Sequence, residues 1–231
     1  MTDLRGGLVS TILRVLVGSR AHGLSRPDSD YDYRTVFLHK TATLLSIGNN
    51  PKLTEWNEKN KQKGAADDTT GWEAGHFLSL ATHCNPTILE VFVAPVEDAN
   101  IYGMQLRELL PFVWHPKGVR DAFVGYGHNQ RTKFLKDEDI RPEKYATAYL
   151  RVLFQAYSLL SGNGLPIAMH DTPVYDTLMK WRGKEYTKGE VIDTTLQWQE
   201  QVEKAYQGCT HTQDLDKVNK YLLFVRWRNW E

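Results

Sequence analysis

The stretch of residues 15–37 constrains the fold of this chain more than any other part of it. It opens with an apolar run from Val15 to Val17, which is typical of a buried strand. Gly18 and Ser19 follow directly. Glycine after a buried strand allows a tight turn that a Cβ would obstruct, and the backbone N–H groups of such a turn can face a phosphate oxygen together with a serine hydroxyl. The first half of the stretch therefore predicts a phosphate-binding turn.

The second half of the stretch carries two aspartates, Asp30 and Asp32. The segment from Tyr31 to Leu38 is rich enough in aromatic and β-branched residues to form a strand, in which side chains two apart share a face. Two adjacent carboxylates repel each other and are costly to keep ionised unless a cation lies between them. Such oxygen ligands suit Mg²⁺, and a nucleoside triphosphate commonly supplies further ligands. The spacing predicts a site for a metal-bound nucleoside triphosphate.

Taken together, the turn and the acidic pair resemble the motif of the DNA polymerase β-like nucleotidyltransferase superfamily. Residues 18–23 (GSRAHG), followed by residues 29–34 (SDYDYR), are similar to the nucleotidyltransferases of bacteria and phages, including the RlaP type associated with RNA repair. The resemblance implies an α/β (α+β) nucleotidyltransferase core with a small mixed sheet, followed by a C-terminal helical domain. It also implies transfer of a nucleoside monophosphate from a triphosphate such as ATP to a hydroxyl, with release of pyrophosphate.

A third carboxylate on a neighbouring strand belongs to the same implied site, where it binds metal and accepts the proton of the attacking hydroxyl. Asp67 and Asp68 are both candidates. Relatives carry an aspartate four residues before an aromatic-acidic pair that opens a helix, and the pair Trp72 and Glu73 then selects Asp68. Because residues 65–70 have little to bury, the register of this strand stays open. A helix N-cap is the structural alternative.

The implied cofactors are two Mg²⁺ ions, with Mn²⁺ as a substitute. Asp30 and Asp32 are expected to bridge both ions, and Asp68 is expected to bind the ion at the acceptor. Gly18 and Ser19 are expected to hold the β- and γ-phosphates.

Four further side chains are candidates for nucleotide binding. Arg20 and His22 flank the turn and are expected to contact phosphate or to position the acceptor, with His22 as general base in a less favoured hypothesis. Lys144 and Arg151 share one face of an expected helix, where relatives carry a similar pair, and they can clamp the β- and γ-phosphates. A solvated basic stripe is an equal alternative. Tyr149 stands where relatives often have histidine, so no imidazole chemistry is assigned there.

We expect a domain boundary where the composition changes, between Pro111 and Gly118. Residues 1–117 would form the palm-like catalytic domain, and residues 118–231 the helical domain that binds nucleotide and acceptor. Within the first domain, we expect a short helix over residues 2–12, a polar loop or mobile hairpin over residues 41–63, with a lid over the substrate as its alternative role, and an amphipathic helix over residues 72–82. In the second domain, helical patterns cover Val119 to Lys136, Pro142 to Ser161, Val174 to Arg182, Lys188 to Gln207 and Leu215 to Trp230.

Three further motifs are interpreted mainly as structural. Asn85 precedes Pro86 and is a good helix N-cap, since proline at the first helical position has no N–H to leave unpaired. Glu90 is interpreted as a surface acid or as one that supports another residue. The basic and aromatic residues 226–230 predict a packed terminal helix with snorkelling arginines, with stacking on nucleic acid as the alternative.

Composition narrows the setting and the partners. The chain has 231 residues and a formal net charge of +0, which disfavours a broad nucleic-acid surface and leaves room for a local basic groove. Cys84 and Cys209 lie far apart and have no partners at metal-ligand spacing, which favours a reducing compartment. No apolar run approaches the ~20 residues of a membrane span, and no signal-peptide pattern is present. We expect a cytoplasmic protein without a membrane partner.

The acceptor is not identified by these residues. An RNA 3′ end, especially of tRNA, is slightly favoured because relatives are associated with RNA repair. A protein hydroxyl, as in AMPylation-type reactions, is the first alternative. A nucleotide-binding sensor or interaction module without turnover is the second.

Overall fold

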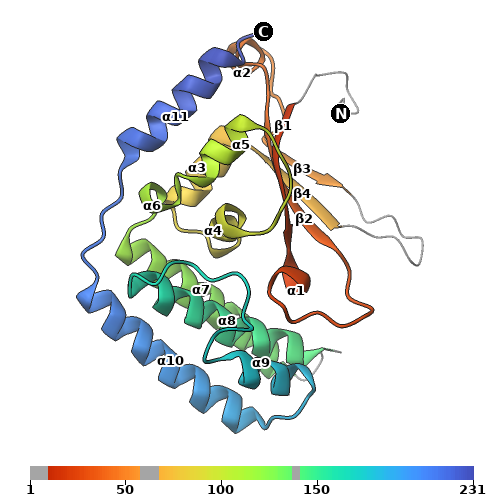
Figure 1. Cartoon of the computed structure of the whole chain (residues 1–231), viewed down its shortest axis with the longest axis vertical. Coiled ribbons are helices and arrows are strands. Elements are labelled where there is room, and N and C mark those ends of the chain that lie inside the picture. The colour runs from red at the N-terminus through yellow and green to blue at the C-terminus, as the bar shows by residue number, and fades with distance from the viewer. Residues whose placement is uncertain (1–9, 58–67, 137–140) are drawn as a thin grey trace.

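The computed structural model of the protein describes residues 10–57, 68–136 and 141–231 (Figure 1). Among these residues a five-stranded sheet has the strand order β3-β4-β2-β1-β5. β2 and β4 run parallel, and the other neighbouring strands run antiparallel. This small mixed sheet confirms the expected α/β (α+β) core. The strands are β1 (Ser10–Val17), β2 (Asp32–Leu38), β3 (Thr54–Asn57), β4 (Asp68–Glu73) and β5 (Val96–Ala99).

β1 lies inside the sheet, between β2 and β5, and delivers apolar side chains to the core. Val15 is completely buried and Val17 nearly so, as the apolar run predicted. The helix expected over residues 2–12 is wrong for residues 10–12, because Ser10 already pairs with Leu38 in the ladder between β1 and β2. Pairing across the sheet outweighs local helix propensity here. Residues 2–9 lie outside the described part.

Short helices follow the strands of the first half of the chain. Asn85 begins one of them as expected, since its side chain accepts a hydrogen bond from the backbone N–H of Thr87 and Pro86 occupies the first turn. The helix expected from residue 72 begins at Ala74, because Trp72 and Glu73 still pair within β4. These helices are α1 (Gly18–Ala21), α2 (Thr41–Leu45), α3 (Ala74–Thr82), α4 (Pro86–Val93), α5 (Ile101–Arg107) and α6 (Leu110–Val113).

The segment expected to be a loop or hairpin, residues 41–63, contains regular structure in its described part. α2 lies near its beginning, and β3 pairs antiparallel with β4 as one arm of a hairpin. Residues 58–63 lie outside the described part. The expectation of a loop is therefore wrong for α2, and β3 pairs with a strand that lies outside the range expected for the hairpin.

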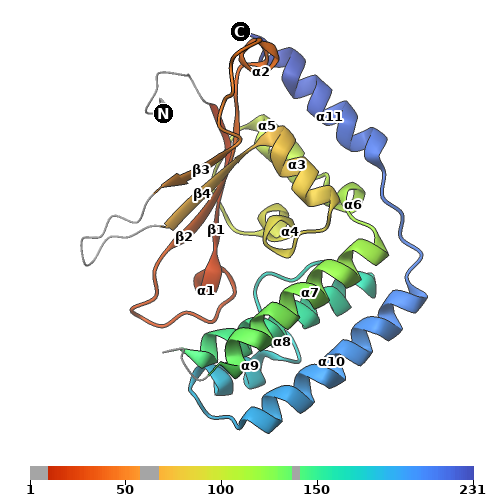
Figure 2. The same cartoon turned by 180° about the vertical axis from the view of Figure 1, so that it is seen from behind.

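The described residues of the second half form four long helices and the eight-residue α9, all close to the expected bounds. Figures 1 and 2 show α7, α8 and α10 stacked below one end of the sheet, with α11 returning beside the upper half. The expected boundary at residue 117 falls in the first turn of α7, and α11 contacts α3 and α6 of the first half. The helices are α7 (Pro116–Leu135), α8 (Pro142–Leu160), α9 (Tyr175–Arg182), α10 (Lys188–Gly208) and α11 (Leu215–Arg228).

α11 is held against the first half by a buried ion pair. The two terminal nitrogens of Arg226 donate to the two carboxylate oxygens of Glu73, at 2.5 and 2.7 Å. Glu73 is 1% exposed and also accepts a hydrogen bond from the first turn of α3. The expectation of snorkelling arginines is wrong for Arg226, whose guanidinium pairs with the buried Glu73. The expectation of a packed terminal helix holds for the buried Val218, Tyr221 and Val225. It is wrong for Trp227 and Trp230, which are 69% and 53% exposed.

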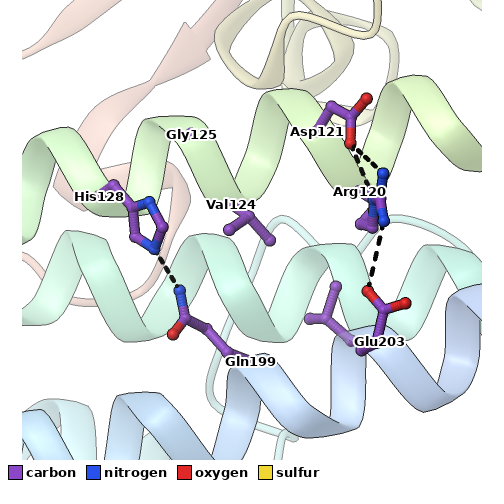
Figure 3. Close-up of a pocket in the computed structure, with 8 residues that line it drawn as sticks. Arg120, Asp121, Val124, Gly125, His128, Gln199 and Glu203 are labelled. Atoms are coloured by element: carbon purple, nitrogen blue, oxygen red, sulfur yellow. Dashed lines mark hydrogen bonds and ion pairs between the residues drawn. The ribbon is translucent and has the colours of Figure 1, made fainter.

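A groove of about 420 Å³ lies between α7 and α10 (Figure 3). Its charged side chains pair with one another, since Arg120 contacts Asp121 at 2.7 Å and Glu203 at 3.6 Å. At the other end of the groove, His128 and Gln199 lie 2.7 Å apart in a hydrogen bond. We therefore interpret the groove as the line of contact between two helices whose polar side chains pair with one another.

Two glycines of α7 should respond oppositely to replacement by alanine. A Cβ at Gly125 would meet no atom within 4 Å, so Gly125→Ala should raise the free energy of unfolding by about 0.5–1 kcal/mol through helix propensity. A Cβ at Gly127 would lie 2.9 Å from the ring of Tyr149, where α7 meets α8. Gly127→Ala should therefore lower it by about 1–3 kcal/mol through overpacking. Urea unfolding of both variants measures this, and equal effects would contradict the packing.

Candidate functional site

The glycine-serine turn lies directly against Asp32. β1 ends at Val17, which pairs with Asp32, the first residue of β2. Gly18 has a φ of +71°, and a Cβ on it would lie 2.2 Å from Oδ2 of Asp32. Only glycine fits this position, because the conformation is left-handed and the carboxylate occupies the space of a side chain. The structure thus joins the predicted phosphate turn to one predicted metal ligand.

Asp68 is brought to the same edge by the sheet. It is the first residue of β4, and the parallel register of β2 and β4 pairs it with Asp32. Neighbouring strands lie about 4.8 Å apart, so the backbones of the two aspartates are adjacent. The side chain of Asp68, and the whole of Asp67, lie outside the described part of the structure. The register matches the neighbouring-strand position that was expected for the third carboxylate.

Asp30 lies two residues before β2 and is exposed. The strand was expected to begin at Tyr31, but it begins at Asp32, so the ladder of β1 and β2 does not include Asp30. The alternation of side chains along a strand therefore does not place Asp30 beside Asp32, although it was expected to. Arg20, from α1, contacts both neighbours of Asp30. Nε and Nη2 of Arg20 donate to the carbonyl oxygen of Ser29 at 3.1 and 2.7 Å, and its guanidinium lies 3.8 Å from the centre of the Tyr31 ring.

A buried polar network connects α1 to the helical half. Glu90 of α4 is 6% exposed, and it forms an ion pair with Arg151 of α8. Gln155, one turn further along α8, donates to the same carboxylate oxygen at 3.2 Å and accepts from Arg151 at 2.9 Å. The second carboxylate oxygen of Glu90 lies 3.8 Å from Nε2 of His22, which follows α1. His22 in turn donates from Nδ1 to the carbonyl oxygen of Ile167 at 3.1 Å.

Electrostatics in this network follow from its burial. Burial lowers the pKa of His22 to about 4, and the charge of Arg151 adds to the shift although Glu90 opposes it. Burial alone would raise the pKa of Glu90, but Arg151, His22 and the hydrogen bond from Gln155 outweigh it, and the pKa lies below its ordinary value. At neutral pH the network therefore holds a neutral imidazole beside a carboxylate paired with a guanidinium.

Lys144 and Arg151 lie two turns apart on α8, and their side chains differ in exposure. Lys144 is exposed, whereas the side chain of Arg151 is only 11% exposed. The ion pair with Glu90 uses Nη1 of Arg151. In the described part of the chain, Nη2 has no hydrogen-bond partner. Arg151 is thus held in place through Nη1 by both Glu90 and Gln155.

The donor set at the edge of β2 and β4 fits a hard divalent cation. A carboxylate lies against a turn that has room for no side chain, and a second aspartate lies in register beside it. In the described part of the chain, no three His, Cys, Asp or Glu side chains are placed to hold a metal ion. That part does not include Asp67 or the side chain of Asp68, so the predicted ligand set of Asp30, Asp32 and Asp68 stays a prediction.

Sequence reasoning did not identify the roles of two residues of the buried network, Glu90 and Gln155. Glu90 was interpreted as a surface or supporting acid, and its burial excludes the surface alternative. Gln155 was not considered, although it lies four residues after Arg151 and therefore on the same helix face. Sequence reasoning could have found Gln155 from one signal, because it is a polar residue in an otherwise apolar run of α8.

Comparison with known proteins identifies a family. The model of the family described as "RlaP: RNA repair pathway DNA polymerase beta family" matches residues 7–222. The YcgL protein of Bacillus subtilis (strain 168) is 26% identical over 139 residues, which cover 59% of this chain and 52% of that protein. A 38.9 kDa protein of enterobacteria phage T4, encoded in the nrdC-mobD intergenic region, is 25% identical over 140 residues, which cover 54% and 39%. The match thus spans about half or less of each relative.

A solved structure was also matched. It is a nucleotidyltransferase-like protein from Exiguobacterium sibiricum 255-15, with 11% sequence identity and a TM-score of 0.29, and the match covers 86% of this chain and 69% of that one. Separately, none of the helices in the described residues combines the length and apolar character that crossing a bilayer requires.

Proposed function

The chain belongs to the RNA repair pathway DNA polymerase beta family, and from this membership we propose that it is a metal-dependent nucleotidyltransferase. It transfers a nucleoside monophosphate from a nucleoside triphosphate such as ATP to a hydroxyl acceptor. The observation that supports the proposal best is the meeting of Gly18, Asp32 and Asp68 at one edge of the sheet. We further propose that the reaction takes place in the cytoplasm.

In the proposed reaction, an oxygen of the acceptor attacks the α-phosphorus of the triphosphate. The bond from the α-phosphorus to the bridging oxygen breaks, and pyrophosphate leaves with that oxygen. Two bound Mg²⁺ ions, or Mn²⁺ in their place, supply charge neutralisation at the attacking and leaving oxygens. Asp30, Asp32 and Asp68 hold these ions, and the carboxylate of Asp68 accepts the proton of the acceptor hydroxyl.

The remaining residues hold the triphosphate. Gly18 and Ser19 bind the β- and γ-phosphates, and Lys144 and Arg151 close the far side. Arg151 suits this task because Glu90 and Gln155 hold its guanidinium in a fixed position. His22 supports the turn from within the buried network, where it lies between Glu90 and the carbonyl oxygen of Ile167.

We propose an RNA 3′ end, in particular that of tRNA, as the acceptor. The description of the matched family as an RNA repair family favours it. The formal net charge of +0 favours a protein hydroxyl instead, because broad RNA-binding surfaces are usually basic. The acceptor is therefore the part of the proposal that an assay must decide.

We expect label from one α-³²P nucleoside triphosphate to enter an RNA fraction when the protein is incubated with Mg²⁺ and total RNA. Parallel reactions contain lysate protein in place of RNA, or EDTA in place of Mg²⁺. Label in a polypeptide would replace the RNA acceptor by a protein hydroxyl. Metal-dependent binding of the triphosphate without any labelled product would overturn the enzyme proposal in favour of a nucleotide sensor.

A further inference from the structure

Asp30 is the predicted metal ligand that lies outside regular secondary structure, whereas Asp32 and Asp68 each begin a strand. It precedes the first ladder pair of β2, which joins Asp32 to Val17. It is exposed, so packing does not fix it either. A carboxylate that must share metal ions with Asp32 nevertheless needs a fixed backbone, since misplacement of a ligand weakens binding steeply. Some other contact has to supply that order.

Arg20 supplies it by holding the residues on either side of Asp30. Its fork donates two hydrogen bonds to the carbonyl oxygen of Ser29, which belongs to the peptide group that leads into Asp30. Its guanidinium also lies over the ring of Tyr31, at 3.8 Å from the ring centre. One side chain thus fixes both neighbours of the aspartate.

The residues that make these contacts, Arg20 and Tyr31, are themselves held by the turn and by the sheet. The ring of Tyr31 stacks on that of Tyr33, with 6.4 Å between centres and 13° between planes. Tyr33 is buried within β2, and Arg14 of β1 lies 4.1 Å from the centre of its ring. Arg20 belongs to α1, which begins at Gly18, and lies two residues after that glycine. The turn that contacts Asp32 therefore also carries the side chain that orients Asp30.

We propose that Arg20 is a positioning residue that fixes the carboxylate of Asp30 for metal binding by holding Ser29 and Tyr31. This inference rests on the proposed function, and it replaces phosphate contact as the task of Arg20. Its two contacts require a planar fork that can both donate twice to one oxygen and stack on a ring. Lysine carries the same charge but cannot make both contacts.

The test compares Arg20→Lys and Arg20→Met with the unchanged protein. Direct Mn²⁺ binding is measured without nucleotide by electron paramagnetic resonance, and kcat, KM for the triphosphate and the Mg²⁺ concentration for half-maximal rate are measured with it. Both variants should weaken Mn²⁺ binding about 10- to 100-fold, the range found when outer partners of metal ligands are removed. KM for the triphosphate at saturating Mg²⁺ should stay within about twofold of that of the unchanged protein, since the phosphate contacts are left in place.

Two further variants separate positioning from general damage. Arg120→Lys removes another arginine that lies over a tyrosine, 4.6 Å from the ring of Tyr206, in a different part of the molecule, and should leave Mn²⁺ binding unchanged. Asp30→Asn should weaken Mn²⁺ binding as much as Arg20→Lys does. Combining the two should cost no more than either alone, because they act through one ligand.

Unchanged Mn²⁺ binding with a raised KM for the triphosphate would make Arg20 a phosphate ligand and overturn the inference, while the proposed function would survive. The same inference is overturned when Arg20→Lys keeps full metal affinity. Failure of the unchanged protein to turn over any triphosphate would instead remove the proposed function. The Mn²⁺ measurement would then still decide the role of Arg20 on its own.

Discussion

Replacing Asp32 by asparagine should abolish nucleotidyl transfer and leave the fold intact. Asparagine has nearly the same shape, so its side chain still fits against Gly18 at the end of β1. It loses the negative charge that two divalent ions require. The rate should fall by at least about 100-fold, which is the scale lost when even an outer partner of a metal ligand is changed. Single-turnover kinetics with the labelled acceptor measures the loss.

A matched control for this variant is available on the edge of the sheet. Asp98 is exposed on β5, where it pairs with Arg14 of β1. Asp98→Asn changes the net charge equally and should keep full activity. Thermal unfolding should show both variants as stable as the unchanged protein, because asparagine keeps the volume of the aspartate side chain that it replaces. Persistent activity of Asp32→Asn would end the assignment of the metal site to the beginning of β2 and β4.

Local sequence patterns predicted the parts of the fold that depend on neighbours along the chain. The apolar run at Val15 to Val17, the glycine after it and the cap at Asn85 each act within a few residues. The helices of the second half were found for the same reason, since their apolar faces repeat every three or four residues. Contact between Gly18 and Asp32 also followed from sequence, because a strand, a turn and a returning strand bring them together.

Contacts between distant segments could not be predicted in this way. Glu73 and Arg226 are separated by 153 positions, and Glu90 and Arg151 by 61. Each of these residues, viewed locally, is a charged side chain on a helix or strand, for which a solvated surface position is the usual outcome. Pairing in the folded chain buries them instead. The stretch before Asp68 has too few apolar residues to fix a register, and its pairing with Asp32 comes from the sheet.

The other large effect is expected at the buried pair of Glu90 and Arg151. Arg151→Met should lower the free energy of unfolding by about 3–5 kcal/mol at neutral pH, because it leaves a buried carboxylate without its cation. Glu90→Gln combined with Arg151→Met should recover most of this loss, since no buried charge remains and the new amide oxygen still accepts from Gln155. Urea unfolding of the single and double variants measures the recovery.

The pH dependence of Arg151→Met tests the same cause. Without the guanidinium, burial dominates and raises the pKa of Glu90 above its ordinary value. A carboxyl group with a raised folded-state pKa favours the folded state at low pH, and that advantage is lost as the pH rises through the ordinary carboxyl range toward the raised value. The deficit of Arg151→Met should therefore be largest at neutral pH and shrink as the pH falls. Lys144→Met, on the exposed side of the same helix, should show no such deficit. A pH-independent loss shared by both variants would show that the ion pair does not hold α4 to α8.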